Sequence, residues 1–139
     1  MNLAIIFFLS AIIVIGALLL FLICFMKKGA THLDIEKYRV KCLAIEQQFK
    51  KDEPSSYHLA VLNADKLLDQ VLKELGYKGQ TMGERLKSAT PKFSNRNDVW
   101  SAHKLRNMIA HETDVRVSYE NARRALTSFR HALKDLGAI

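Results

Sequence analysis

Three residues in the last third of the chain, Arg106, Asn107 and His111, carry side chains that could act together on a phosphodiester. An arginine has a permanent planar cation that can hold a phosphate through two hydrogen bonds. A histidine can accept or donate a proton near neutral pH, and an asparagine amide can orient a phosphate or a ribose hydroxyl. We therefore expect Arg106, Asn107 and His111 to be catalytic residues.

Helical geometry limits how this arginine and this histidine can cooperate. Five residues at about 100° each place Arg106 and His111 roughly 140° apart around a regular helix, so one helix cannot point both into one small pocket. Either the helix ends near His111, as the residues from Glu112 to Asp114 suggest, or a second copy of the chain completes the site across a two-fold axis. The second alternative predicts a homodimer that pairs through this helix.

Three further residues of the same helix, Arg96, His103 and Lys104, are expected to bind RNA. His103 stands one turn before Arg106, where it either lines the same surface or is a half-buried histidine of the core. Other arginines in this half of the chain also precede a histidine, with six residues between them: Arg96 and His103, and Arg124 and His131. The spacing alone is therefore a weak signal. Context favours Arg106, because an amide follows it directly and the helix stops at the histidine.

The chain after residue 26 is expected to be helical throughout, because apolar residues recur every three or four positions and no segment alternates with period two. Thr81 with Glu84 fits a capping box, and Gly76 and Gly137 stand where helices end. The expected helices cover residues 33–51, 57–75, 81–89, 95–111 and 118–136. Their short connections favour an all-α, up-and-down bundle of four or five helices.

Three polar residues interrupt the long helix expected at 57–75, namely His58, Asp65 and Asp69. A lone carboxylate on a helix is seldom catalytic, and charged residues are mostly exposed in folded proteins. We therefore expect these three side chains to be solvated. His131 is likewise expected on the polar face of the last helix.

The segment from Leu3 to Met26 carries no charge and is interrupted only by Ser10 and Gly16. About 20 apolar residues suffice to cross the hydrocarbon core of a bilayer as a helix. A secretory signal peptide would have a basic n-region and a small-residue cleavage site, and neither is present. We expect a single membrane anchor.

Positive charge follows this anchor directly, at Lys27, Lys28, Lys37, Arg39 and Lys41, and none precedes it. The positive-inside rule then places the N-terminus outside and the rest of the chain in the cytoplasm of the cell. The expected domains are an anchor at 1–26, a juxtamembrane amphipathic helix at 27–54 and a bundle at 55–139. The apolar seam from Ile35 to Phe49 either pairs two chains above the membrane or packs on its own domain.

Charge is unevenly distributed along a chain whose net charge is +7. Residues 27–76 hold nine basic and eight acidic side chains, whereas residues 77–139 hold twelve basic and six acidic. A basic half suits phosphate-bearing partners, either nucleic acid, a nucleotide or the anionic inner leaflet. The cysteines, Cys24 and Cys42, are not spaced to bind zinc. No metal site, cofactor site, phosphate-cradling glycine loop or nucleophile elbow is expected.

With Arg106, Asn107 and His111 in this arrangement, the chain resembles the HEPN superfamily (higher eukaryotes and prokaryotes nucleotide-binding) over about residues 57–136. Ribonucleases of that superfamily carry an arginine, four to six residues and then a histidine, commonly with a polar residue directly after the arginine. The resemblance implies a helical dimer with a composite, metal-independent ribonuclease site in its cleft. It also implies that a member can have lost catalysis and serve as a binding or scaffold module.

Two other functions remain alternatives to a metal-independent endoribonuclease acting on RNA at the cytoplasmic membrane face. One is a membrane-tethered helical adaptor, or a scaffold that binds a nucleotide or RNA without cleaving it. The other is a lipid-facing module that uses the basic residues of 77–139 to bind anionic lipid.

Overall fold

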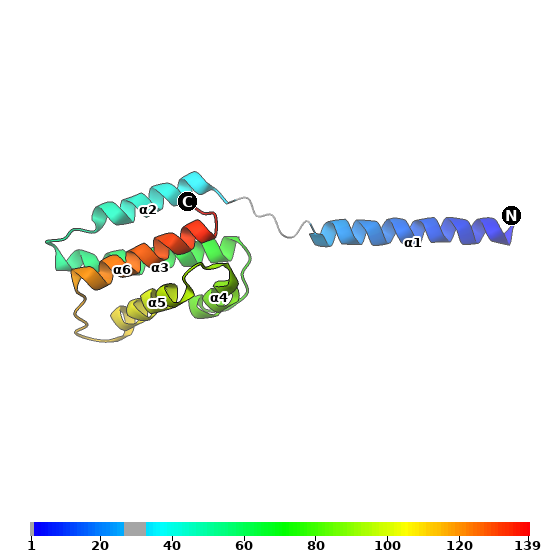
Figure 1. Ribbon diagram of the computed structural model, residues 1–139. Helices are drawn as coiled ribbons and strands as arrows, with labels where there is room; N and C mark the ends of the chain where they lie inside the picture. The colour runs from blue at the N-terminus through cyan, green and yellow to red at the C-terminus, as the bar shows by residue number, and fades with distance from the viewer. Residues whose placement is uncertain (1, 27–32) are drawn as a thin grey trace. The chain divides into compact units, whose positions relative to one another are not determined.

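The computed structural model describes residues 2–26 and 33–139, and within these ranges all regular structure is helical. The chain divides into two compact units, one up to Thr31 and the other from His32 to Ile139 (Figure 1). An all-α fold with one long apolar helix ahead of a helical bundle is thus confirmed. Lys27 and Lys28, on which the expected orientation partly depends, lie outside the described residues.

The first unit contains helix α1, Leu3–Met26. Its stretch from Leu3 to Ile23 is 21 residues long and has a mean hydropathy of 3.1. At about 1.5 Å per residue it is long enough for the roughly 30 Å hydrocarbon core of a bilayer. Large apolar side chains are exposed between Leu3 and Ile23. The structure therefore contains one helix able to span a membrane by length and composition.

The second unit is a bundle built around one long central helix, α3 (Pro54–Glu74). Helices α2 (Ile35–Gln48), α4 (Met82–Ala89), α5 (Arg96–His111) and α6 (Tyr119–Asp135) all pack against it, and a short 3₁₀ turn, η2 (Thr90–Lys92), follows α4 (Figure 1). Helix α6 also packs along α5. The largest fully buried apolar side chains are Tyr38, Phe129, Leu68, Leu72, Leu86, Leu133, Val61 and Val71.

The helix ends have local causes that the sequence had indicated. The Thr81 hydroxyl accepts a hydrogen bond from the Glu84 backbone N–H, and the two residues form the predicted capping box of α4. Gly76 and Gly137 adopt φ of +77° and +69° just after α3 and α6, a left-handed conformation that glycine adopts at low cost. These signals fix where the connections between the helices lie.

Helix α2 packs on its own domain along its seam from Tyr38 to Phe49, while Ile35 at its start is exposed. Tyr38 is fully buried, and Cys42, Ile45 and Phe49 pack against the core. The Phe49 ring is stacked on that of Tyr119 at 5.0 Å between centroids. Of the two alternatives for the seam, the structure therefore confirms the intramolecular one, and α2 belongs to the same compact unit as residues 55–139.

The expectation that His58, Asp65 and Asp69 are solvated was wrong. Asp65 is only 2% exposed, and the Asp69 side chain is 16% exposed with two cationic partners. The His58 ring is half-buried, and its Nε2 lies 3.0 Å from the carbonyl oxygen of Val115. Lys73 of α3 itself pairs with Asp69, but the other partners of these polar groups come from other helices and loops, which the pattern of a single helix does not contain.

Candidate functional site

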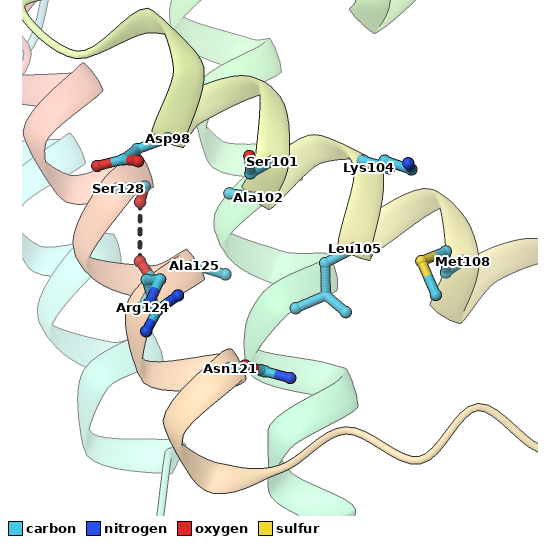
Figure 2. Close-up of a pocket in the computed structure, with 10 residues that line it drawn as sticks. All are labelled: Asp98, Ser101, Ala102, Lys104, Leu105, Met108, Asn121, Arg124, Ala125 and Ser128. Carbon is cyan, nitrogen blue, oxygen red and sulfur yellow. Dashed lines mark hydrogen bonds between the residues drawn. The ribbon is translucent and has the colours of Figure 1, made fainter.

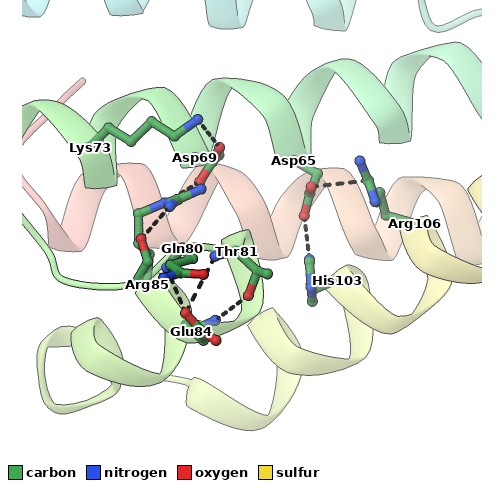
Figure 3. Close-up of polar contacts among 10 residues, drawn as sticks. Asp65, Asp69, Lys73, Gln80, Thr81, Glu84, Arg85, His103 and Arg106 are labelled. Carbon is green, nitrogen blue, oxygen red and sulfur yellow. Dashed lines mark hydrogen bonds and ion pairs between the residues drawn. The ribbon is translucent and has the colours of Figure 1, made fainter.

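The buried carboxylate of Asp65, in the middle of α3, holds two residues of α5. His103 Nδ1 lies 2.7 Å from Asp65 Oδ1, and Arg106 Nε lies 3.2 Å from Asp65 Oδ2. Figure 3 shows both side chains directed from α5 toward this carboxylate. His103 is itself buried, at 6% exposure, whereas the Arg106 side chain remains 34% exposed.

Asn107 joins these groups into a closed ring of four residues. Its amide nitrogen lies 3.2 Å from His103 Nε2, and its Oδ1 accepts a hydrogen bond of 3.0 Å from Arg106 Nη1. Because the carboxylate of Asp65 accepts from Nδ1–H, the neutral tautomer of His103 leaves Nε2 to accept from the amide. Arg106 Nε makes an ion pair with Asp65 without an aligned hydrogen bond. We call Asp65, His103, Arg106 and Asn107 the Asp65 ring.

The Asp65 ring restricts the freedom of the residues that the sequence singled out. Both nitrogens of His103 are engaged, so this histidine is a positioning residue rather than an available proton carrier. The guanidinium of Arg106 shares its charge with Asp65, and its exposed edge faces solvent. Burying a charged group such as the carboxylate of Asp65 is costly, so a cluster built around a buried charge is a candidate for a functional site.

His111 is the last residue of α5 and is exposed, beyond the Asp65 ring. The helix is regular up to this residue, and Glu112, with extended backbone, ends it. Because Arg106 is directed to Asp65 and His111 lies roughly 140° further around the helix, the single chain does not bring the two side chains together. Their convergence in one catalytic site stays a prediction that depends on a second chain.

Lys104 lies at the rim of a groove between α5 and α6 with a volume of about 320 Å³. Figure 2 shows Ala102, Leu105 and Ala125 in this groove, with Lys104 on α5 and Arg124 on α6. Arg96, the third residue expected to bind RNA, is the exposed first residue of α5. The structure thus leaves Lys104 and Arg96 accessible, while it buries His103, the alternative that the sequence had left open.

A second cluster lies one helical turn along α3, around Asp69. Arg85 Nε donates to Asp69 Oδ1 at 2.7 Å, and Lys73 Nζ lies 2.8 Å from Asp69 Oδ2. Arg85 Nη1 also donates to the carbonyl of Gly79 at 2.7 Å, so the cluster fastens the turn between α3 and α4 (Figure 3). We call Asp69, Lys73, Arg85 and Gly79 the Asp69 clasp.

Sequence reasoning missed Asp65, although the sequence contained a signal for it. Asp65 follows Val61 by four residues and precedes Leu68 by three. Those spacings place it on the same helix face as two core residues, where a carboxylate must find a buried partner. A charge at such a position indicates an internal ion pair rather than a solvated side chain.

No group of three or more histidine, cysteine, aspartate or glutamate residues that could hold a metal ion occurs within residues 2–26 and 33–139. Comparison with protein-family models, with curated proteins and with solved structures gives no match to this chain.

Proposed function

We propose that this chain is a membrane-anchored, HEPN-like protein that cleaves RNA at the cytoplasmic face of the membrane without a metal ion. The single observation that carries the proposal is the Asp65 ring. It fixes Arg106 and Asn107, the two residues expected to bind the scissile phosphate, in one geometry on the solvent edge of α5. A preorganised cation and amide are what transition-state stabilisation requires.

In this mechanism His111 deprotonates the ribose 2′-hydroxyl or protonates the leaving 5′-oxygen. Arg106 stabilises the negative charge that develops on the phosphorus oxygens, and Asn107 orients the phosphate. The products are a 2′,3′-cyclic phosphate and a 5′-hydroxyl. Because Arg106 and His111 diverge on one helix, the active form is a homodimer in which α5 helices pair and each chain completes the site of its partner.

Helix α1 supplies the anchor in the bilayer, and the basic residues after it support a cytoplasmic bundle with the N-terminus outside. Protease treatment of the full chain carrying a C-terminal epitope tests this orientation. The epitope should resist protease added to intact cells and be digested in inside-out vesicles. Digestion on intact cells would contradict the orientation.

The nuclease is tested with the full chain in detergent micelles and a labelled single-stranded RNA. The wild type should yield fragments that end in a 2′,3′-cyclic phosphate, and His111→Ala should lose at least about 100-fold in rate, the usual minimum for a general acid or base. His131→Ala, an exposed histidine on α6, is the matched control and should cleave normally. Equal activity of His111→Ala and wild type would refute the assignment.

A second candidate function is favoured by the ion pair between Arg106 and Asp65 within one chain. A guanidinium committed to an internal partner suits a tethered adaptor, or a scaffold that binds RNA and catalyses nothing. This candidate predicts intact RNA with every variant. RNA binding without cleavage would support the RNA-binding scaffold. Absence of both binding and cleavage would support the adaptor.

A further inference from the structure

The solvent-facing side of α5 carries one line of residues that the catalytic assignment does not fully use. Trp100, Lys104, Asn107 and His111 follow one another at spacings of four, three and four residues. Such spacings keep side chains on one helix face. Trp100, Lys104 and His111 are exposed and Asn107 is half-buried. We call these four residues the outer stripe of α5.

Trp100 is a large aromatic residue that is partly exposed on this surface. It is the only tryptophan of the chain, and 36% of it is exposed. Its ring meets the ring of His103 edge-on, with 6.1 Å between centroids and an interplanar angle of 78°. Because His103 is fixed by Asp65, the indole rests against a side chain that cannot easily move.

A shallow hollow of about 380 Å³ lies beside this indole. It is lined by Trp100, Ser101, His103, Lys104 and Asn107. One side therefore offers an aromatic surface, and another offers a cation and the amide that the Asp65 ring holds in place. An aromatic ring beside a basic residue is the combination with which proteins bind single-stranded nucleic acid.

We propose that Trp100 stacks on an unpaired base of single-stranded RNA in this hollow, while Lys104 contacts a neighbouring phosphate. The inference rests on the proposed function and deepens it, because it names the part of the substrate that is bound. Along the outer stripe, Trp100 and Asn107, which orients the scissile phosphate, are about 10 Å apart at the helical rise. The stacked base thus lies to one side of the cleaved bond and sets the register of the strand.

The test uses the full chain in detergent micelles, with His111→Ala present so that RNA stays intact. A labelled oligoribonucleotide reports binding by its fluorescence anisotropy, and the intrinsic fluorescence of Trp100 reports stacking in the same titration. Binding should quench the indole emission over the same concentration range. Inorganic polyphosphate, which has charge but no bases, should leave the emission unchanged.

Two substitutions separate stacking from folding. Trp100→Leu should weaken RNA binding by about tenfold, the usual effect of losing one aromatic–base stack, while Trp100→Phe should retain most of the affinity. Lys104→Gln should weaken RNA binding. Lys134→Gln on α6, the matched control for loss of one exposed charge, should weaken it less. Circular dichroism establishes that each variant is folded.

The outcomes distinguish this inference from the function on which it rests. RNA that binds without quenching, together with unchanged affinity of Trp100→Leu, would overturn the stacking site and leave RNA binding intact. Failure of any RNA to bind would overturn both. If RNA binds tightly and quenches the indole emission but the wild-type chain does not cleave RNA, the stacking site is supported and only the nuclease activity is refuted.

Discussion

Two carboxylates one turn apart on α3, Asp65 and Asp69, each have two basic partners but differ in their surroundings. Each pairs with an arginine. Asp65 is 2% exposed, and both of its partners belong to α5. The Asp69 side chain is 16% exposed, with one partner on α4 and one, Lys73, on its own helix.

The difference shows what each cluster accomplishes. In the Asp69 clasp, Arg85 donates to the backbone carbonyl of Gly79, so the hydrogen bonds of this cluster stabilise the turn between α3 and α4. The Asp65 ring includes Arg106, which reaches solvent, and Asn107, which belongs to the outer stripe of α5. One carboxylate therefore supports a loop, whereas the other supports the helix that carries every residue of the proposed nuclease site.

The largest effect is expected for Asp65→Ala. This change leaves His103 Nδ1–H without its acceptor in the core and Arg106 without its counter-charge, and loss of one partner from a buried pair costs about 3 to 5 kcal/mol of unfolding free energy. Urea unfolding of the fragment 32–139, which contains the whole core, measures it by circular dichroism. A loss below about 1 kcal/mol would show that the ring is not an internal support.

A smaller loss, about 2 kcal/mol, is expected for Arg85→Ala, because the change removes two hydrogen bonds of a charged group. Asp69 keeps its ion pair with Lys73, and its partial exposure lets water replace the guanidinium. The same unfolding measurement applies. If Arg85→Ala were more destabilising than Asp65→Ala, the proposed ranking of the two clusters would be reversed.

The Asp69 clasp should also be sensitive to acid. Burial raises the pKa of Asp69, but hydrogen bonds from Arg85 and Lys73 lower it by more in sum, so this pKa lies below its ordinary value of 3.8. A carboxyl with a depressed folded-state pKa stabilises the fold above its unfolded-state pKa, and the contribution is lost as pH falls through the folded-state pKa. The stability gap between wild type and Asp69→Asn should be constant above about pH 5 and shrink below about pH 4. A gap that persists unchanged at low pH would contradict this.

The smallest effect is expected for Arg39→Ala, which removes an exposed ion pair with Glu36. The two side chains are 57% and 74% exposed, and the charged atoms are 3.7 Å apart. Exposed pairs of this kind contribute about 0.5 kcal/mol or less. A loss comparable to that of Arg85→Ala would mean that exposure does not separate the two kinds of pair in this chain.

The helices were predictable from the sequence because their causes are local. Apolar spacing, the capping box at Thr81 and Glu84, and the glycines after α3 and α6 all lie within a few residues of the ends that they determine. The burial of Asp65 was not predicted, because its partners His103 and Arg106 come from a helix that is distant in the chain. The spacing of Asp65 from Val61 and Leu68 indicates its buried face, but it does not say which residues of the other helices become its partners, because that depends on packing across the bundle.

The candidate site was predictable in part. The spacing of four residues between His103 and Asn107 allows their contact on one helix face, and the structure has that contact. The direction of Arg106 was not predictable, because only the position of Asp65 draws its guanidinium toward α3. Whether His111 meets an arginine depends on a second chain, and that information is absent from the pattern of a single helix.

Ultraviolet crosslinking of RNA to the full chain, followed by mass spectrometry of tryptic peptides, tests the central claim most directly. The claim is that RNA lies along the outer stripe of α5. Crosslinks are then expected on the peptides covering residues 97–104 and 107–116, which hold Trp100, Lys104, Asn107 and His111. Crosslinks confined to the basic helix α6, or none at all, would contradict it.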